Sequence, residues 1–220
     1  MEHKSISQSV FNRLPLYLNY LKTLPEDSPC NISATTIANV LNMGEVQVRK
    51  DLAAVSDGGK PKIGYLVADL IEQLEVFLGY KDVDDAVIIG AGKLGKALLD
   101  YEGFNEYGLN IIAAFDNNND LAGETTSGKP IFPMDKFEDL CSRLKVRIGI
   151  ITVPAENAQE VCDLMVKNNI LAIMNFAPVH LNVPQNIILR NENFAASLAL
   201  LSKKLTIKMY NDDNHKEENV

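Results

Sequence analysis

The stretch VIIGAGKLGKALLDYEGF, residues 87–104, decides the fold of most of the chain. It begins as an apolar run that suits a buried strand, breaks at three glycines, and then becomes amphipathic as a surface helix does. A strand, a GxGxxG turn and a helix in immediate succession are typical of dinucleotide-binding folds. The stretch therefore predicts an α/β domain that begins with a phosphate-binding turn.

Each glycine of this turn has a physical role. Gly90 permits the tight turn, Gly92 lets backbone approach a pyrophosphate, and Gly95 lets the helix pack near the sheet. The pyrophosphate would lie at the helix N-terminus, where unpaired N–H groups and the helix dipole favour an anion. The turn residues expected to bind the cofactor are Gly90, Ala91, Gly92, Lys93, Leu94 and Gly95.

Strand and helix patterns alternate through the rest of this region. Apolar runs suited to strands buried on both faces occupy residues 87–89, 111–115, 148–153 and 171–175. Helical patterns separate them at residues 93–100, 134–144 and 155–168, and two short strands are expected at 130–132 and 187–190. This alternation predicts a parallel sheet with right-handed crossovers.

An acidic residue at the end of the second strand bears on the choice of cofactor. Asp116 closes the run IIAAFD and lies 26 residues after Gly90, against about 20 in the usual pattern. Its carboxylate can accept from a ribose 2′-hydroxyl and would repel a 2′-phosphate. We therefore expect NAD and NADH as cofactors. The alternative is that the glycines only make a turn and that Asp116 caps a loop.

Loops after two later strands are placed for the nicotinamide half of the cofactor, since ligands bind beyond the carboxyl ends of parallel strands. These loops are TVPAENAQ at 152–159 and NFAPVHLNVP at 175–184. The cofactor-binding candidates in them are Val153, Pro154, Asn175 and Phe176. Ordinary loop punctuation by proline is the alternative interpretation.

The segment NISATTIANVLNMGEVQVRKDLAAV, residues 31–55, predicts a helix-turn-helix. Ser33 can cap the first helix. In the second helix, residues 45–55, Val46 and Leu52 are expected to face inward, and a glycine-rich wing would follow at 56–65. The DNA-binding candidates are Ser33, Thr35, Gln47, Arg49, Lys50, Lys60 and Lys62. The alternative is a solvated helical face followed by a surface turn.

Composition limits the remaining functions. The 220 residues carry a net charge of −8, which argues against affinity of the whole chain for nucleic acid or acidic membranes. Residues 1–65 hold seven Lys and Arg against six Asp and Glu, so the N-terminal part does not share the excess of acidic residues. Three scattered cysteines, no metal-ligand cluster and no membrane-length apolar run predict a cytoplasmic protein without metal or membrane partners.

An enzymatic function lacks the residues that it needs. Hydride transfer requires a substrate pocket and usually a proton donor, yet only one helix and a tail follow residue 190. Tyr101, His180 and Lys93 are isolated titratable candidates, so no catalytic residue is assigned. Two alternatives stay open: a small NAD-dependent oxidoreductase, and a DNA-binding protein whose second domain senses another nucleotide or only dimerises.

The chain closely resembles the Rex family of redox-sensing repressors. The resemblance rests on RLPLYLNYL (13–21), QVRKDL (47–52), IGY (63–65), GAGKLGKAL (90–98), AAFD (113–116), VPAENAQ (153–159) and NFAPVHLNVP (175–184). It implies a homodimer that binds a palindromic DNA operator with NAD+ and leaves it with NADH. The implied domains are a winged helix at 1–80, a Rossmann domain at 81–192, a domain-swapped helix at 193–210 and a disordered tail at 211–220.

Two departures from the family stand out. The stretch after QVRKDL usually reads SYFGEFGKRG in Rex proteins, whereas here it is AAVSDGGKPK, residues 53–62. The family also has Asp where this chain has Asn193, and that Asp exchanges between partners that match Tyr101 and Arg13. The resemblance implies Arg13, Tyr101 and Asn193 as switch residues. It also implies a nicotinamide pocket of Tyr101, Phe104, Phe176 and a partner's Phe194.

Overall fold

The computed structural model describes residues 6–217 and divides the chain into two compact units. The first unit contains the described residues up to Val83 together with Asn105–Gly108. The second contains Asp84–Phe104 and the described residues from Leu109 onward. The segment Asn105–Gly108 joins the first unit because Tyr107 stacks edge-on against Tyr80, with ring centroids 5.2 Å apart.

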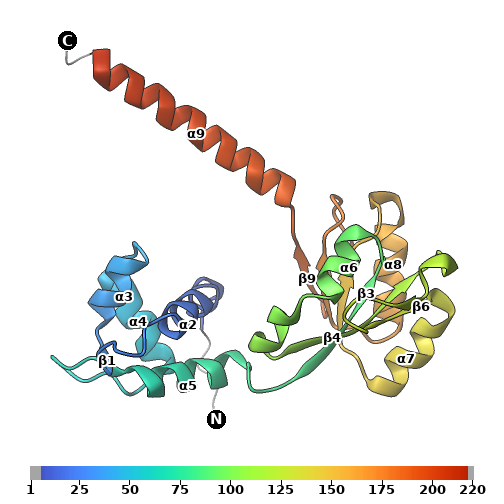
Figure 1. Ribbon diagram of the computed structural model, residues 1–220, viewed down its shortest axis with the longest axis horizontal. Helices are drawn as coiled ribbons and strands as arrows, with labels where there is room; N and C mark the ends of the chain where they lie inside the picture. The colour runs from blue at the N-terminus through green and yellow to red at the C-terminus, as the bar shows by residue number, and fades with distance from the viewer. Residues whose placement is uncertain (1–5, 218–220) are drawn as a thin grey trace. The chain divides into compact units, whose positions relative to one another are not determined.

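The N-terminal unit is a small helical domain with a two-stranded sheet (Figure 1). Its elements in order are α1 (Gln8–Phe11), α2 (Leu14–Lys22), β1 (Asn31–Ile32), α3 (Ala34–Val40), α4 (Glu45–Val55), β2 (Tyr65–Leu66) and α5 (Val67–Leu78). Strands β1 and β2 pair antiparallel. Helices α3 and α4 form the expected helix-turn-helix, and the segment between α4 and β2 is the wing.

The helix-turn-helix follows from local sequence. Ser33 caps α3 by accepting a hydrogen bond from Thr36 N at 3.0 Å. The expectation that Val46 faces inward is wrong, because this side chain is 63% exposed. Val48 and Asp51 are buried instead, and they lie with Leu52 on one face of α4 at helical spacing. Gln47, Arg49 and Lys50 are exposed, as expected.

The second unit is built on a seven-stranded sheet of order β5-β6-β4-β3-β7-β8-β9. Its strands are β3 (Asp84–Ile89), β4 (Leu109–Asp116), β5 (Gly123–Glu124), β6 (Pro130–Pro133), β7 (Ile148–Ile151), β8 (Ala172–Asn175) and β9 (Ile188–Asn191). Six of these strands pair in parallel, and their order is that of a Rossmann fold. The sequence did not predict β5, a two-residue antiparallel edge strand.

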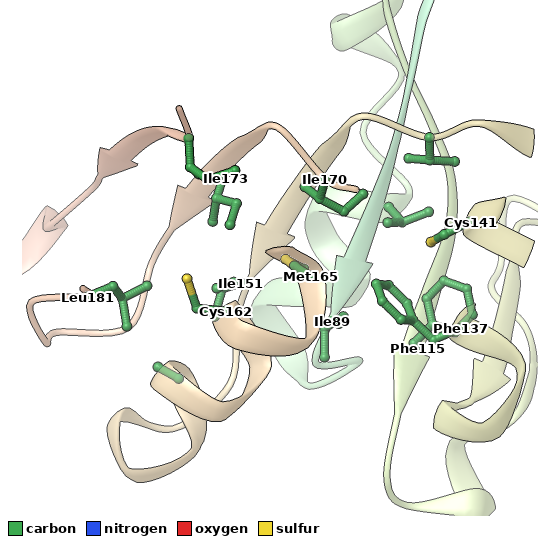
Figure 2. Close-up of a cluster of buried hydrophobic side chains, with 14 of the residues drawn as sticks. Ile89, Phe115, Phe137, Cys141, Ile151, Cys162, Met165, Ile170, Ile173 and Leu181 are labelled. Atoms are coloured by element: carbon green, nitrogen blue, oxygen red, sulfur yellow. The ribbon is translucent and has the colours of Figure 1, made fainter. Parts of the chain in front are cut away.

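Helices cover both faces of this sheet (Figure 1). They are α6 (Lys93–Leu99), α7 (Phe137–Leu144) and α8 (Ala155–Lys167), and short 3-10 turns lie at Glu102–Tyr107, Asn119–Leu121 and Met134–Lys136. Figure 2 shows the larger core, where Phe115 packs edge-on against Phe137 with ring centroids 5.1 Å apart. A second core joins Ile88, Leu99 and other residues on the face that α6 covers.

The three cysteines differ in their surroundings. Cys141 and Cys162 are buried in the core shown in Figure 2, and burial raises the pKa of both thiols. Cys30 is exposed. None of the three forms a disulfide in the part of the chain that the structure describes.

The last helix, α9, spans Phe194–Glu217. It continues past Tyr210, where the sequence pattern placed its end and a disordered tail, because no glycine or proline interrupts residues 211–217. Residues 218–220 of that expected tail lie outside the described residues. Over residues 6–217, no helix is long and apolar enough to cross a membrane.

Candidate functional site

A cavity of about 220 Å³ lies at the carboxyl ends of the central strands in the second unit. It forms where the strand order reverses between β3 and β7, the usual ligand position in an open parallel sheet. Its lining residues are Ile89, Gly90, Gly92, Asp116, Asn117, Met134, Thr152, Val153, Pro154, Asn157 and Val161. The glycine turn, the acidic strand end and the loop after β7 therefore meet in one place.

The glycines of the turn are held by close contacts. Gly90 has φ +106°, and a Cβ there would lie 2.8 Å from the Thr152 carbonyl carbon. A Cβ at Gly95 would overlap the Gly90 carbonyl oxygen, so α6 can approach the turn only with glycine there. A Cβ at Gly92 would meet nothing within 4 Å. Gly90 and Gly95 are therefore required by packing, whereas Gly92 faces open space.

Thr152 is a residue of this site that the sequence analysis did not assign. Its hydroxyl donates to the Gly90 carbonyl at 2.7 Å and lies 3.2 Å from the Ile89 carbonyl. The side chain thus ties the start of the glycine turn to the end of β7. A threonine directly after a buried strand was the available signal, but only the register of β3 on β7 assigns it this partner.

Asp116 lies on the cavity wall and already accepts two backbone hydrogen bonds. Its Oδ2 accepts from Ala91 N at 2.6 Å, and its Oδ1 accepts from Asn118 N at 2.8 Å. The carboxylate therefore connects the end of β4 to the glycine turn. Each carboxylate oxygen keeps a further lone pair, so the side chain can also accept from a ribose hydroxyl.

Asn175 does not offer its side chain to a ligand. It is fully buried, and its Nδ2 donates toward the carbonyls of Ala177 and Val179 at 3.1 Å each and toward Asn191 Oδ1 at 2.9 Å. Its Oδ1 accepts from Ala177 N at 2.9 Å. The amide instead fixes the loop after β8 and joins it to Asn191 at the end of β9. By contrast, Val153 and Pro154 line the cavity.

Two aromatic pairs lie on the second unit. The ring of Tyr101 is 57% exposed and meets Phe104 edge-on, with centroids 5.1 Å apart. Phe176 contacts Phe194 of the same chain, with centroids 5.5 Å apart. The resemblance placed a partner's Phe194 beside Phe176, so the single chain uses its own residue for that contact.

A second cavity, of about 500 Å³, lies in the N-terminal unit between the start of α3, α4 and the wing. Five of the DNA-binding candidates line it: Ser33, Thr35, Arg49, Lys60 and Lys62. Gln47 and Lys50 do not line it but are exposed on α4. The cavity therefore brings the start of α3, Arg49 of α4 and both wing lysines together.

Family models match both parts of the chain. One described as "CoA binding domain" covers residues 82–179, and one described as "Putative DNA-binding protein N-terminus" covers residues 5–53. The redox-sensing transcriptional repressor Rex of Pelotomaculum thermopropionicum is 38% identical over 208 residues, with 94% of this chain and 98% of that protein covered. The Rex repressor of Treponema denticola is 41% identical, with 89% and 93% covered.

The chain belongs to the Rex family. Its curated Rex relatives are transcriptional repressors, so the prediction that it is not an enzyme is confirmed. Three solved structures of RSP, a Rex-family repressor, share the fold. The complex with β-NAD+ and operator DNA is 33% identical, with a TM-score of 0.86 and 96% and 98% of the two chains covered. The complex with β-NADH is 32% identical, with a TM-score of 0.85 and 96% and 99% covered.

The predicted Rex switch residues are distributed over both units. Arg13 belongs to the first unit, whereas Tyr101 and Asn193 belong to the second. Asn193 caps α9, since its Oδ1 accepts from Ala196 N at 2.9 Å. The amide that replaces the family's carboxylate therefore has its oxygen engaged in a helix cap, and its Nδ2 group can still donate.

No group of three or more His, Cys, Asp or Glu side chains suited to a metal ion occurs among residues 6–217 where the structure describes them.

Proposed function

We propose that this Rex-family chain is a DNA-binding transcriptional repressor that responds to the ratio of NADH to NAD+. The observation that carries the proposal is the cavity at the crossover of β3 and β7, where the glycine turn and Asp116 meet. The solved RSP complexes, one with β-NAD+ and operator DNA and one with β-NADH, support it as relatives of the same fold.

The cofactor-binding residues of this proposal follow the cavity. Residues 90–95 would hold the pyrophosphate, and Asp116 would bind the adenosine ribose. Val153 and Pro154 would line the cavity on the side where the nicotinamide enters. Tyr101, Phe176 and Phe194 would form an apolar nicotinamide pocket. Such a pocket prefers the neutral ring of NADH, because it avoids burying the positive ring of NAD+.

The difference in affinity between NADH and NAD+ limits how far the cofactor can shift the protein between its DNA-binding and released states. A ligand shifts such an equilibrium only by the difference in its affinity for the two states. A change from 1:99 to 99:1 takes about 5.5 kcal/mol, or about 2.8 kcal/mol per site in a dimer. Equal binding of NADH and NAD+ would therefore contradict the proposal. In this scheme NADH releases the protein from DNA and NAD+ permits binding.

DNA recognition is assigned to the N-terminal unit. Gln47 and Arg49 on α4 are proposed to reach base edges in the major groove, and Lys50 to contact a phosphate. The wing lysines would contact the backbone beside the minor groove. Two such units related by a two-fold axis would require a palindromic operator.

A homodimer is proposed from the apolar face of α9. This helix exposes large apolar side chains, and Leu201 is 62% exposed. The exposed set on α9 is Phe194, Leu198, Leu200, Leu201, Leu205, Ile207, Met209 and Tyr210. Phe194, Leu198, Leu201, Leu205 and Met209 share one face of the helix at helical spacing, and a second copy with a swapped helix would cover that face. A repressor of this kind would act in the cytoplasm.

The dimer is tested by light scattering on the intact chain, whose single copy weighs 24.3 kDa. Leu201→Asp should yield monomers, because it buries a charge at the interface. Lys203→Asp places the same side chain on the other side of α9, about 200° around the helix from Leu201, and serves as the control, which should remain dimeric. A monomeric wild-type chain, or dimers that survive both substitutions equally, would contradict the proposed interface.

The function is tested by selecting duplexes from a palindromic library and measuring their affinity with NAD+, with NADH and without cofactor. We expect tight binding with NAD+ or no cofactor and release by NADH. Isothermal titration of each cofactor, without DNA, measures the differential affinity directly. Release by neither cofactor would contradict the assignment as a sensor. Oxidation of NADH by an added keto substrate, or reduction of NAD+ by an added hydroxy substrate, would contradict it as well.

A further inference from the structure

The tip of the wing is a tight turn with an unusual residue in it. Ile63 N donates to the Lys60 carbonyl at 3.2 Å, with Pro61 and Lys62 between them. Lys62 has φ +67°. Proline at the second position and a positive φ at the third are the features of a type II turn, whose third position favours glycine.

The wing is held on both sides of this turn. Lys60 and Gly64 exchange two backbone hydrogen bonds, each 2.9 Å long. A Cβ on Gly64 would overlap the Ile32 carbonyl oxygen, and a Cβ on Gly59 would lie 2.7 Å from the ring of Tyr65. The surroundings therefore determine the backbone of the wing, and Lys62 has to accept the left-handed conformation.

A lysine in this conformation is less stable than a glycine would be, because its Cβ crowds the backbone. Backbone strain of this kind persists mainly at functional positions. Lys145 has a similar φ of +54° at the end of α7, so the left-handed backbone alone assigns no role to Lys62, and the surroundings of its side chain have to be considered.

The surroundings of Lys62 are those of a cationic cavity beside the turn. Lys60, Lys62 and Arg49 line it together with the hydroxyl-bearing residues Ser33, Thr35 and Tyr65. None of the lining residues, all of them within the described part of the chain, is acidic. Arg49 also pairs with Glu45 of the same helix, so the two wing lysines are the cations free of that partner. Three cations and several hydroxyl donors around one cavity suit a singly charged phosphodiester.

We propose that this cavity binds one phosphodiester of the operator backbone and that the left-handed Lys62 supplies its principal ammonium contact. The inference rests on the proposed DNA-binding function and deepens it. Lys62 then contributes affinity without base preference, because a phosphate is the same at every position of the duplex. The rebuilt wing of this chain is thus a backbone contact, and discrimination between operators belongs to α4.

The test compares three variants of the full chain, each measured for melting temperature and for operator affinity against salt concentration. Lys62→Gly should melt about 2–4 °C higher, because glycine relieves the left-handed strain. The same variant should bind operator roughly tenfold more weakly at 0.1 M salt, with a salt slope smaller by about 0.9. Opposite changes in stability and affinity are the signature of a strained binding residue.

Two matched variants separate charge from strain. Lys60→Gln also removes a lining cation. Because Lys60 precedes proline, its backbone is restricted to extended conformations and carries no left-handed strain, so the melting temperature should not rise. Lys62→Arg keeps both the charge and the strain, so affinity, salt slope and melting temperature should stay at the wild-type values.

Several outcomes would overturn the inference. An unchanged salt slope in Lys62→Gly would show that the cavity binds no phosphate, and a lower melting temperature would show that the turn is not strained. A changed ranking of operator sequences would make Lys62 a base-reading residue instead. All three failures leave wild-type operator binding intact. Loss of operator binding by the wild-type chain itself would refute the proposed function, and this inference with it.

Discussion

Arg13 and Asp51 form a two-point ion pair inside the N-terminal unit. Nε of Arg13 donates to Oδ2 of Asp51 at 2.7 Å, and Nη2 donates to Oδ1 at 2.9 Å. Asp51 is only 3% exposed, and Tyr17 donates a third hydrogen bond to it at 2.7 Å. The hydrogen bonds to Asp51 raise the pKa of Arg13 further above its ordinary value. The pair therefore ties α4, the proposed recognition helix, to α2.

Substitution of Asp51 should destabilise the N-terminal unit. Asp51→Asn leaves the Arg13 guanidinium without a counter-charge, and loss of one partner of a buried pair costs about 3 kcal/mol. We expect a fall of this size in the free energy of unfolding, measured by urea titration. Glu45→Gln breaks the exposed pair with Arg49 and should cost less than about 0.5 kcal/mol. Equal losses in both variants would contradict the role of Asp51.

The contact between Tyr17 and Asp51 predicts a loss of stability at high pH. Burial and the carboxylate of Asp51 raise the pKa of Tyr17 to about 12, from about 10 in the unfolded chain. The neutral phenol therefore contributes fully below pH 10, and this contribution disappears as the pH rises toward 12. Tyr17→Phe should be less stable than wild type at pH 9, and the difference should shrink by pH 12. A constant difference would contradict the shift.

Two glycines of the cofactor turn, Gly95 and Gly92, should respond differently to alanine. Gly95→Ala forces a Cβ against the Gly90 carbonyl, so the second unit should unfold more easily, by about 2 kcal/mol or more. Gly92→Ala adds a methyl group in open space and should fold normally, but the methyl would stand where a pyrophosphate approaches. Thermal melting and NADH titration measure the two effects. Normal NADH affinity in Gly92→Ala would contradict the pyrophosphate position.

Tyr101 is predicted to report the state of the cofactor rather than to stabilise the fold. Tyr101 is 57% exposed, so its side chain contributes little to the packed core. Tyr101→Phe should therefore leave the melting temperature unchanged within about 1 °C. It should raise the NADH concentration needed for release from the operator more than it changes operator affinity without cofactor. Gel-shift titrations with increasing NADH measure both quantities.

Asn193→Asp restores the family's carboxylate at the start of α9. The new side chain can still cap the helix through Ala196 N, and its charge suits a helix N-terminus. In the Rex family a carboxylate at this position is expected to take part in the redox switch, so its return should widen the difference between the two cofactor states. We expect about a tenfold larger ratio of operator affinities between NAD+ and NADH, equal to about 1.4 kcal/mol. Asn193→Ala, which removes the cap without adding charge, should show no such gain.

Much of the architecture was predictable because it depends on local patterns. The apolar runs of the second unit gave six strands at their observed places, and the helical period and caps gave α3 and α4. The strand β5 was missed because two residues carry no periodicity. Val46 was misplaced because two valines flank Gln47, and only packing against the other helices shows that Val48 is the buried one.

The sequence by itself determined the order of the parts: a helix-turn-helix, a glycine turn after a buried strand, an acid at the next strand end, and a terminal apolar helix. Each of these depends on neighbours a few residues apart. Only the tertiary structure decided that the Asn175 amide hydrogen-bonds its own loop, that the Thr152 hydroxyl donates to the Gly90 carbonyl, and that Arg13 pairs with Asp51. The two groups of each hydrogen bond lie on different segments of the chain or could bind a ligand instead. Whether they meet depends on their distance and orientation in the folded chain, which local sequence patterns do not give.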